Sequence, residues 1–453
     1  MSRRRVLIAG AAGRDFHDFN TVYRDDPRCE VVAFTAAQIP GIERRRYPAS
    51  LAGPLYPEGI PIIGEARLEE VLRERAVDEV VLGYSDLSHL EVMHLASRAL
   101  AGGADFTLLG PRRTMLAAPL PVIAVCAVRT GAGKSPAVRW LSRRLRALGL
   151  RCAIIRHPMP YGDLERQAAQ RYAAPADLDR AGCTVEEREE YEPHLALGNV
   201  VYAGVDYARV LAMAAAESDL ILWDGGNNDL PFLRPDLLAV LADPLRPGHE
   251  ETHHPGEACL RMADVIVLSK CDSAPAGAVE AVAAACRRLN PRAALARAAL
   301  PIRLEQAEQV RGRRVVVVED GPTITHGGMP WGAGFLAAQR AGAAEIVDPR
   351  PAAAPEIARV YARYPHIGRV LPAVGYSPAQ LEALRRTLDA VDAELIVSAT
   401  PADLARLIPL AKPVLRARYE FEEQGPAVLW GAVEALLASR GLAPCLTPPP
   451  QPA

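Results

Sequence analysis

Short apolar runs alternate along this chain with longer stretches in which apolar residues recur every three or four positions. Runs of the first kind predict buried strands, and stretches of the second kind predict amphipathic helices. Their repeated alternation is typical of α/β layers with mostly parallel sheets, which is the fold class that we predict. In the first quarter of the chain the predicted strands are 30–34, 60–63, 79–82 and 106–109, and the predicted helices are 68–75 and 90–100.

An apolar run at 6–9 leads into a glycine turn, Gly10-Ala-Ala-Gly13, and predicts a small Rossmann-like domain over residues 1–118. The full pattern of three glycines is absent, and no acidic residue ends the second predicted strand. The turn therefore leaves two interpretations open, a structural scaffold and a site for a phosphate or dinucleotide. A dehydrogenase that uses this turn is a further alternative. The proline-marked stretch 111–121 is the first predicted boundary.

The most informative segment is the strand-like run 122–128 together with the residues that follow it. A glycine-rich turn and a predicted helix come next, which is the context that a phosphate-binding P-loop requires. Backbone N–H groups of such a turn surround phosphate oxygens, a lysine reaches the β- and γ-phosphates, and a serine binds Mg²⁺. Val128 stands where the usual motif has its first glycine. The predicted nucleotide-binding residues here are Thr130, Gly131, Ala132, Gly133, Lys134 and Ser135.

Two later predicted strands end in residues that would complete a nucleotide site. The first ends at Asp224 before a glycine-rich turn, where a Walker B aspartate would join Ser135 in the Mg²⁺ shell. The second ends in Ser269-Lys270-Cys-Asp272, a variant of the Asn/Thr-Lys-x-Asp motif in which the aspartate accepts hydrogen bonds from guanine. Ser269, Lys270 and Asp272 are therefore candidate base contacts. Serine in place of asparagine leaves ATP or GTP open, with a slight preference for ATP.

Composition narrows the classes of partner. The chain of 453 residues carries 52 basic and 54 acidic residues, and its formal charge of −2 argues against nucleic acid or an anionic membrane as the main partner. No apolar run is long enough for a membrane span, and eight scattered cysteines predict reduced thiols in a cytoplasmic protein.

We expect a P-loop domain at 119–334, a C-terminal α/β region at 335–445 and a disordered proline-rich tail at 446–453.

Three loops rich in arginine and histidine should emerge where open α/β sheets bind ligands, at the C-terminal edge of the P-loop sheet. Cationic groups there would hold an anionic substrate. Plain loop structure is one alternative, and a metal site in the histidine cluster at 249–254 is another. The charge run at 186–194 is expected to be a solvated helix face. The candidate substrate-binding residues are Arg156, His157, Arg246, His249, His254, Glu257 and His326.

Four segments resemble the cyclic 2,3-diphosphoglycerate synthetase family, many of whose bacterial members are described as predicted GTPases. They read Trp223-Asp-Gly-Gly-Asn-Asn-Asp, Asp243-Pro-Leu-Arg-Pro-Gly-His, His254-Pro-Gly-Glu and Glu319-Asp-Gly-Pro-Thr-Ile-Thr-His-Gly-Gly-Met. The resemblance covers about 300 residues, and the N-terminal segment is similar to that of the bacterial branch. It implies a ligase-like reaction that requires ATP and Mg²⁺. That reaction closes a phosphoanhydride between the two phosphates of 2,3-diphosphoglycerate and releases ADP and phosphate.

Within that reaction Lys134, Arg129 and Asp224 are the predicted catalytic residues, because two highly charged anions must be brought together. Arg129 lies five residues before Lys134, where the related dethiobiotin synthetase-like and MinD-like P-loop enzymes often carry a second lysine. Nucleotide-dependent dimerisation in that class leads us to expect a homodimer. The competing hypothesis is a regulatory or chaperone-like GTPase that acts as a conformational switch on a protein partner.

Overall fold

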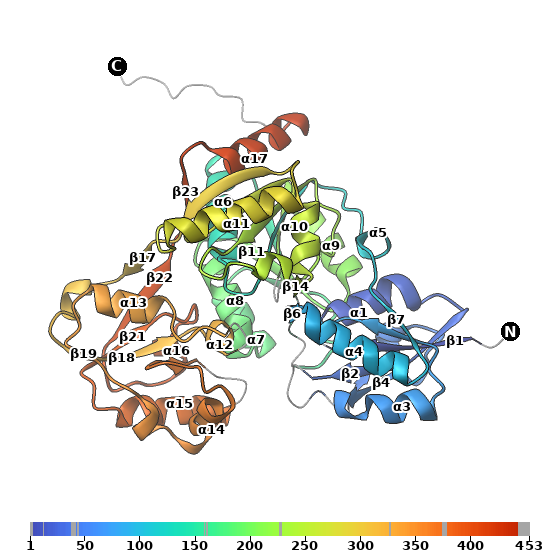
Figure 1. The fold of residues 1–453 in the computed structure, drawn as a ribbon, viewed down its shortest axis with the longest axis horizontal. Helices are drawn as coiled ribbons and strands as arrows, with labels where there is room; N and C mark the ends of the chain where they lie inside the picture. The colour runs from blue at the N-terminus through green and yellow to red at the C-terminus, as the bar shows by residue number, and fades with distance from the viewer. Residues whose placement is uncertain are drawn as a thin grey trace.

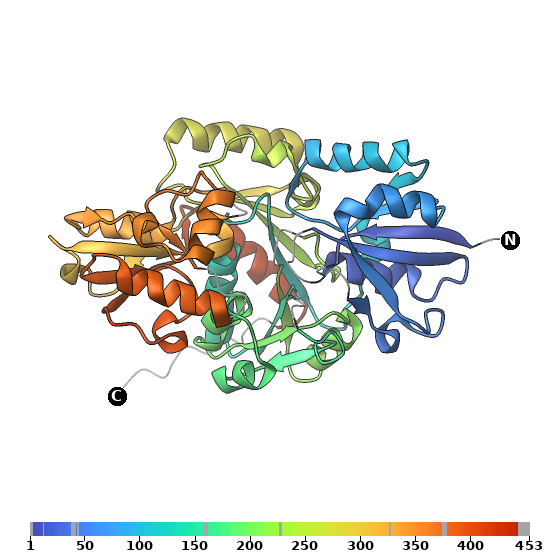
Figure 2. The ribbon, with the colours of Figure 1, turned by 90° about the horizontal axis from the view of Figure 1, so that it is seen from below.

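In the computed structural model the chain forms three α/β domains, each built around its own sheet (Figure 1). The structure describes residues 3–11, 13–37, 42, 45–157, 159, 162–225, 229–325, 328–373 and 378–442. The first and third domains lie on opposite sides of the central domain, as the two views in Figures 1 and 2 agree. Neighbouring strands are mostly parallel in all three sheets, as the sequence pattern predicts.

The first sheet has the strand order β3-β4-β2-β1-β5-β7, and only the pair β3–β4 is antiparallel. From β1 the chain passes to β2 on one side and later to β5 on the other. The C-terminal ends of β1 and β5 therefore mark the switch point of a Rossmann-like sheet. The elements are β1 (Arg4–Ala9), β2 (Cys29–Ala36), β3 (Arg46–Tyr47), β4 (Ile60–Gly64), β5 (Glu79–Leu82), β7 (Asp105–Thr107), α1 (Arg14–Asp18), α2 (Ala49–Ala52), α3 (Leu68–Glu74), α4 (His89–Ala101) and α5 (Pro111–Thr114).

The central sheet has nine strands in the order β10-β11-β9-β12-β8-β13-β15-β16-β23. Alternate residues of β8 enter two separate cores: Ile123 and Val125 pack on one face of the sheet, and Val122 and Ala124 pack on the other. Because helices cover both faces, every residue of β8 is buried, which explains its unbroken apolar run. The strands are β8 (Val122–Ala127), β9 (Cys152–Arg156), β10 (Gln170–Tyr172), β11 (Val200–Ala203), β12 (Leu220–Asp224), β13 (Leu237–Ala242), β15 (Val265–Leu268), β16 (Ala294–Ala299) and β23 (Glu422–Gln424).

The helices of the central domain connect these strands and leave the C-terminal ends of β8, β12 and β13 on one edge of the sheet. A two-stranded pair of β6 (Leu87–Ser88) and β14 (His253–His254) joins the first domain to this edge. The helices are α6 (Lys134–Ala147), α7 (Pro175–Ala181), α8 (Val185–Leu195), α9 (Tyr207–Ala215), α10 (Gly256–Met262), α11 (Ala276–Leu289) and α17 (Val428–Ser439).

The third sheet has the order β17-β22-β21-β18-β19, with β20 also paired to β18. Its strands are β17 (Ile302–Leu304), β18 (Arg314–Glu319), β19 (Glu345–Ile346), β20 (Leu371–Pro372), β21 (Leu395–Ser398) and β22 (Val414–Tyr419). Its helices are α12 (Gly321–Ile324), α13 (Ala333–Arg340), α14 (Pro355–Arg363), α15 (Pro378–Ala390) and α16 (Leu404–Leu407).

The expected boundary at residue 334 does not agree with these sheets. β17 and β18 precede it but belong to the third sheet, and β23 and α17 return to the central domain. The return has a packing reason, because Leu429, Trp430 and Val433 of α17 are buried in a core of the central sheet. Apolar periodicity marks α17 as a helix but does not show which sheet covers it. The expected tail at 446–453 lies outside the described residues.

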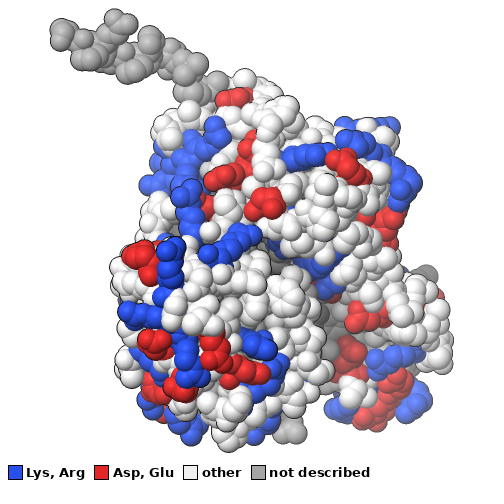
Figure 3. Space-filling view, turned by 60° about the vertical axis from the view of Figure 1, so that its left-hand side comes forward, with Lys and Arg blue, Asp and Glu red and all other residues white. Residues whose placement is uncertain are grey.

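Three further observations concern the surface charges, the helices and the cysteines. On the face shown in Figure 3, basic and acidic side chains are interspersed over the central and third domains. Within the described residues, no helix has the length and apolar character needed to cross a membrane. The seven cysteines in the described part of the chain are free thiols, and five of them are buried.

Candidate functional site

The P-loop joins β8 to α6 at the C-terminal edge of the central sheet. Gly131 and Gly133 have φ angles of 79° and 100°, which are left-handed values that favour glycine. A Cβ on Gly133 would lie 2.5 Å from Leu300 Cδ1, so this position also lacks room for a side chain. Val128, in place of the first glycine of the motif, is buried and continues the pairing of β8 with β13. Lys134 begins α6, whose first N–H groups lack intrahelical acceptors and suit phosphate oxygens.

Asp224, at the end of β12, lies beside the serine of the P-loop. β12 pairs with both β8 and β9, and the register sets Asp224 next to Arg156. Arg156 forms ion pairs with Asp224 and with Glu190 of α8, and it donates to Ser135 Oγ at 3.2 Å. Ser135 Oγ donates to Asp224 Oδ1 at 3.5 Å, and His194 Nε2 donates to Asp224 Oδ2 at 3.0 Å. We call these five residues the Asp224 cluster.

Burial and mutual contacts set the charges of the Asp224 cluster. Burial alone raises the pKa of Asp224, but Arg156, His194 and Lys134 outweigh it and hold that pKa well below its usual range. Burial lowers the pKa of His194, so the ring is neutral and carries its proton on Nε2. Burial also lowers the pKa of Lys134, while Asp224 and Asp86 oppose that shift. Asp224 is therefore an ionised carboxylate that has no exposed surface.

The charge run on α8 is buried, so the expected solvated face is wrong. Residues 186–189 are all buried because α8 lies between the central sheet and the third domain. Glu189 accepts a hydrogen bond from the Thr400 hydroxyl of the third domain. Burial, together with the nearby charge of Asp320, raises the pKa of Glu189 well above its usual range. The α8 carboxylates thus form an acidic wall between the Asp224 cluster and the third domain.

Arg129 links the P-loop to the first domain. Its Nε lies 2.9 Å from Asp86 Oδ1, and its Nη1 donates to His253 Nε2 at 2.5 Å. His249 Nδ1 lies 3.4 Å from the same nitrogen, and the two histidine rings stack with centroids 4.5 Å apart. Burial, with the charge of Arg129 added to it, lowers the pKa of His253 to about 4 and also lowers that of His249. Both rings are therefore neutral acceptors near pH 7.

Arg246 and the base motif share one carboxylate, Asp243, which follows β13. Arg246 Nε and Lys270 Nζ donate to Asp243 Oδ2 at 3.0 and 2.7 Å. Arg246 Nη2 also donates to the carbonyl of Thr130 at 2.8 Å, which braces the P-loop. Burial raises the pKa of Asp243, but Lys270 and Arg246 outweigh it, so the net shift is downward. We expected the Arg246 guanidinium to contact a substrate phosphate. It instead binds Asp243 and the carbonyl of Thr130.

Asp272 stabilises the turn of the base motif. Its Oδ1 accepts from the N–H of Leu300 at 3.0 Å, and its Oδ2 accepts from Ser273 Oγ at 3.2 Å. Ser269 is fully buried and donates to the carbonyl of Ala242 at 3.1 Å. In the guanine-binding motif the aspartate offers its oxygens to the base, whereas here both oxygens have protein partners. A base contact by Asp272 stays a prediction.

Comparison with known proteins identifies the family. Arginine synthetase ArcE of Thermococcus kodakarensis is 54% identical over 432 residues, which cover 95% of this chain and 96% of the relative. This chain belongs to that family. No family model matches the chain.

Two further similarities are more distant. Tetraacyldisaccharide 4'-kinase of Geobacter sulfurreducens is 31% identical over 179 residues, which cover 37% of this chain and 49% of the kinase. The structure of LpxK from Aquifex aeolicus in complex with ATP is 14% identical and covers 82% of this chain and 99% of that chain, with a TM-score of 0.43.

Membership of the arginine synthetase family makes this chain an enzyme of the ligase class, and the P-loop makes it nucleotide-dependent. The resemblance to cyclic 2,3-diphosphoglycerate synthetases therefore holds at the level of an ATP-dependent synthetase. The family shown here is named for a different product.

In this member of the arginine synthetase family, His157 lies at a junction of the first and central domains. It forms an ion pair with Asp229, which also accepts a hydrogen bond from Ser85 of the first domain. A Cβ on Gly13 would lie 2.3 Å from His157 Cε1. This close packing of the N-terminal glycine turn favours the scaffold interpretation of that turn.

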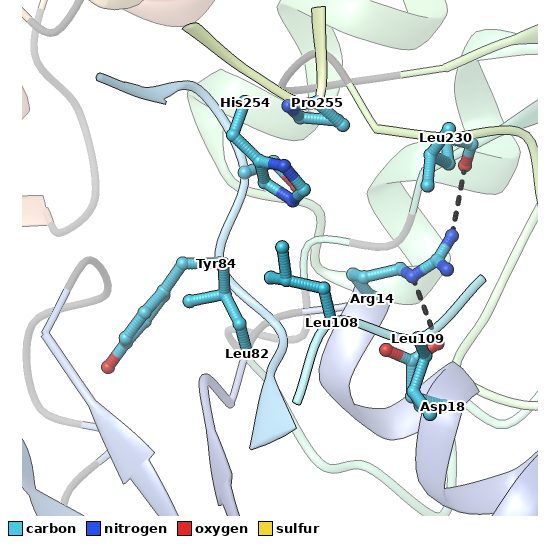
Figure 4. Close-up of a pocket in the computed structure, with 10 residues that line it drawn as sticks. Arg14, Asp18, Leu82, Tyr84, Leu108, Leu109, Leu230, His254 and Pro255 are labelled. Carbon is cyan, nitrogen blue, oxygen red and sulfur yellow. Dashed lines mark hydrogen bonds and ion pairs between the residues drawn. The ribbon is translucent and has the colours of Figure 1, made fainter. Parts of the chain in front are cut away.

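A pocket lies at the switch point of the first sheet, beneath His254 of the central domain (Figure 4). Its cavity volume is about 20 Å³, which is room for little more than one water molecule, and it is partly open to solvent. Arg14 Nε lies 2.9 Å from Asp18 Oδ1, and Arg14 Nη1 donates to the carbonyl of Leu230 at 3.4 Å. Burial raises the pKa of Asp18 to about 7 and lowers that of His254 to about 4. The predicted substrate residue His254 therefore faces this pocket as a neutral ring.

The remaining candidates contact other protein groups or lie outside the described residues. Glu257 pairs with Arg261 at 2.6 Å and lies 3.6 Å from His89 of the first domain. His326 falls in a part of the chain that the structure does not describe. Among the described residues, no three His, Cys, Asp or Glu side chains are grouped so that they could hold a metal ion, so the metal hypothesis for the histidine cluster gains no support.

Sequence reasoning missed several residues around the P-loop, namely Asp86, Glu190, His194 and Asp229. His194 and Glu190 belong to the charge run that we expected to be solvated. The capping box of Thr184 and Glu187 marks the start of α8 and was a usable signal for the helix. Asp86 has no local motif, because the first domain alone brings it to the P-loop.

Proposed function

We propose that this chain forms arginine in an ATP-dependent reaction and that the P-loop is its ATP site. The observation that carries the proposal is the Asp224 cluster, which sets a serine hydroxyl and an ionised carboxylate at the start of α6. The proposal is also supported by the 54% identity between this chain and Arginine synthetase ArcE, which extends over nearly the whole chain. The P-loop supplies the phosphate site that a synthetase of this kind needs.

The chemistry of the product defines the reaction class. The guanidinium carbon of arginine carries three nitrogens, and citrulline carries oxygen where arginine has one of them. Transfer of the γ-phosphoryl group to that oxygen would turn it into a phosphate leaving group. Attack by ammonia on the carbon then expels phosphate with the former ureido oxygen, which gives arginine, ADP and inorganic phosphate. Each bond that breaks is matched by one that forms, and no oxidant or reductant is required.

The residues of the P-loop fit this role. Lys134 and Arg129 would neutralise charge on the transferring phosphoryl group, in a step that depends mainly on positioning and electrostatics. Ser135 and the Oδ1 of Asp224 are the groups that would hold Mg²⁺ or its bound water, and their spacing of 3.5 Å is compatible with a shared cation. Bound Mg²⁺ would supply Lewis-acid neutralisation of the phosphates. Arg156 and His194 orient Asp224 through its other oxygen.

One carboxylate of α8 favours an amino acid over a bisphosphate. Glu190, in the Asp224 cluster, keeps 32% of its side chain exposed, and the ammonium group of an amino acid or the guanidinium of arginine would complement it. The side chains expected to hold a diphosphate already have partners within the protein: Arg156 contacts Asp224, His157 contacts Asp229 and Arg246 contacts Asp243.

The second candidate is the ring closure of 2,3-diphosphoglycerate that the sequence resemblance implies. The adjacent cations Arg129 and Lys134 favour it, because they would suit a substrate phosphate next to the γ-phosphate of ATP. Both candidates use ATP at the same P-loop and differ in the acceptor oxygen. The choice of ATP over GTP and the homodimer belong to the same proposal.

A single assay separates the candidates. Purified protein is incubated with Mg²⁺ and ATP or GTP, together with citrulline and ¹⁵N-ammonium or with 2,3-diphosphoglycerate. Phosphorus NMR follows ADP and phosphate, and mass spectrometry of the amino acids follows ¹⁵N. We expect ¹⁵N-arginine, ADP and phosphate in equal amounts, with ATP preferred to GTP.

The control is Lys134→Ala, which should abolish all nucleotide-dependent turnover, because the other two lysines are held elsewhere: Lys270 pairs with Asp243, and Lys412 donates to backbone carbonyls of α15. A cyclic bisphosphate in place of arginine would establish the second candidate. Turnover that appears only with a protein partner would favour the switch hypothesis. Turnover with neither small molecule and with no partner would contradict both synthetase proposals.

A further inference from the structure

The loop after β5 brings a carboxylate of the first domain to the P-loop. β6 in this loop pairs antiparallel with β14 of the central domain, with Ser88 opposite His253. The N–H of His89 also donates to the carbonyl of Thr252 at 2.8 Å. These backbone bonds fix the position of Asp86, which immediately precedes β6. The segment 83–88 is therefore attached to both domains.

Asp86 contacts the same groups that a phosphate would use. Its Oδ1 lies 2.9 Å from Arg129 Nε and 3.5 Å from the backbone N of Thr130, which is part of the P-loop. Its charge also acts on Lys134 and opposes the lowering of that pKa by burial. The side chains of Arg129 and Asp86 are only 12% and 11% exposed, so water screens this pair weakly. A guanidinium, a loop N–H and a lysine are the donors that P-loops offer to nucleotide phosphates.

We propose that Asp86 is an anion latch: without nucleotide its carboxylate occupies the terminal-phosphate side of the P-loop, and a nucleoside triphosphate displaces it. Displacement follows from charge, because a carboxylate and a terminal phosphate cannot share Arg129 and Lys134 without strong mutual repulsion. A diphosphate lacks the terminal phosphate and leaves Asp86 in place. Asp86 thus lowers the affinity of the site for a triphosphate and leaves the affinity for a diphosphate unchanged. The inference rests on the proposed binding of nucleotide at the P-loop.

The local backbone supports a latch that can be released. Asp86 has a φ of 60°, a left-handed conformation that aspartate tolerates but does not favour. Its neighbour Ser85 donates to Asp229, which lies in the loop after Asp224. Movement of the segment 83–88 would therefore change contacts at two places: those of Asp86 with the P-loop and that of Ser85 with Asp229. The first domain would in this way be coupled to the phosphate state of the nucleotide.

Equilibrium binding tests the sign of the effect. Titration calorimetry measures the affinity of wild type and Asp86→Asn for Mg²⁺ with AMPPNP, a non-hydrolysable triphosphate, and for Mg²⁺ with ADP. We expect Asp86→Asn to bind AMPPNP at least fivefold more tightly than wild type does, with ADP affinity changed by less than twofold. A residue that merely positions Arg129 predicts the opposite sign. AMPPNP affinity that is unchanged or weakened in Asp86→Asn overturns the latch.

Glu70→Gln is the matched control, since it removes another carboxylate of the first domain that is paired with an arginine, Arg67, far from the P-loop. It should leave both affinities unchanged. Hydrogen exchange on wild type gives a readout that does not depend on how a variant folds. AMPPNP, but not ADP, should increase exchange in the segment 83–88. Equal or reduced exchange with AMPPNP overturns the latch.

These measurements use nucleotide alone, so failure of arginine synthesis would leave them intact. Wild-type protein that binds no AMPPNP at all would overturn the latch together with the proposed ATP site. Normal AMPPNP binding without the Asp86 effect would overturn the latch alone.

Discussion

Asp224 keeps its negative charge although none of its surface is exposed, because Arg156, His194 and Lys134 surround it. The neutral His194 donates one hydrogen bond to it, and Asn199 Nδ2 lies 3.5 Å from the other ring nitrogen of His194. The two oxygens of the Asp224 carboxylate therefore have different partners. Oδ2 is held by Arg156 and His194, and Oδ1 faces Ser135.

Replacement of Asp224 by asparagine keeps the size of the side chain and removes its charge. We expect Mg²⁺-dependent turnover to fall by about a hundredfold or more, because the variant loses the charge that orders the cation. Nucleotide binding without Mg²⁺ should change much less, which calorimetry can measure. Asp219→Asn, at the other end of the same strand, removes a partly buried partner of Arg151 and serves as the control. Equal losses with and without Mg²⁺ would exclude Asp224 from the metal shell.

At the scale of elements, a loop and a helix outside the P-loop hold the site together. The loop after β13 binds the P-loop through Arg246, and α8 fills the space between the central and third domains. Both elements are charged, and both use their charges on neighbouring protein groups. Their contribution to function is therefore expected to act through position as well as through substrate contact.

Arg246→Ala should weaken nucleotide affinity by about tenfold, because the bond from Arg246 to the carbonyl of Thr130 braces the P-loop. It also leaves Asp243 with Lys270 alone, so the melting temperature should fall by a few degrees. Arg246→Lys should restore part of both losses, since one ammonium cannot reach both acceptors. The KM of the amino-acid substrate, measured at saturating ATP, should stay nearly constant. A change confined to that KM would restore the predicted role of Arg246 in substrate binding.

Glu189→Gln should stabilise the protein in alkaline solution. Burial and Asp320 raise the pKa of Glu189, so the folded protein favours the protonated acid. A carboxyl with a raised pKa contributes stability below its unfolded pKa and loses it as pH rises toward the folded value. Glutamine imitates the protonated form at every pH. We expect a higher melting temperature than wild type at pH 8.5 and none of that gain at pH 5. A gain of the same size at both values would contradict this explanation.

At the scale of the whole molecule, the first domain is joined to the central one through buried uncharged histidines. His17 of α1 donates from Nε2 to the carbonyl of Thr114 at 2.6 Å and stacks on Phe232 of the central domain at 4.2 Å. Burial, with Arg14 added to it, lowers the pKa of His17 to about 3, and burial lowers that of His254 to about 4. Protonation of either ring works against this junction.

Acid should therefore loosen the junction of the first and central domains. A histidine whose folded pKa is depressed contributes stability above its unfolded pKa of about 6.5, and that stability is lost as pH falls toward the folded value. For His17 the loss should reach about 2–3 kcal/mol by pH 4.5. Thermal unfolding between pH 7.5 and 4.5 measures it, and His17→Gln should flatten the curve. Parallel curves for variant and wild type would assign the acid sensitivity to other groups.

The sequence by itself determined the elements whose signals are local. The run that became β8, the glycines of the P-loop and the aspartate after β12 are each specified by a few adjacent residues, and they predict both the α/β class and the nucleotide motif. The strands 60–63 and 79–82 agree with β4 and β5 for the same reason, since an apolar run bounded by turns is a strong strand signal.

Only the tertiary structure decided which segments meet. Asp86 is 43 residues from Arg129 and has no motif, and its ion pair exists because the first domain docks on the P-loop. The charged residues of α8 predict a solvated helix face, but the third domain covers them. The chain returns to the central sheet with β23 and α17 more than 100 residues after it left that sheet at β16. Local periodicity reports which side of an element is apolar. It does not report the partner that buries a charge, because that partner is chosen by packing between distant segments.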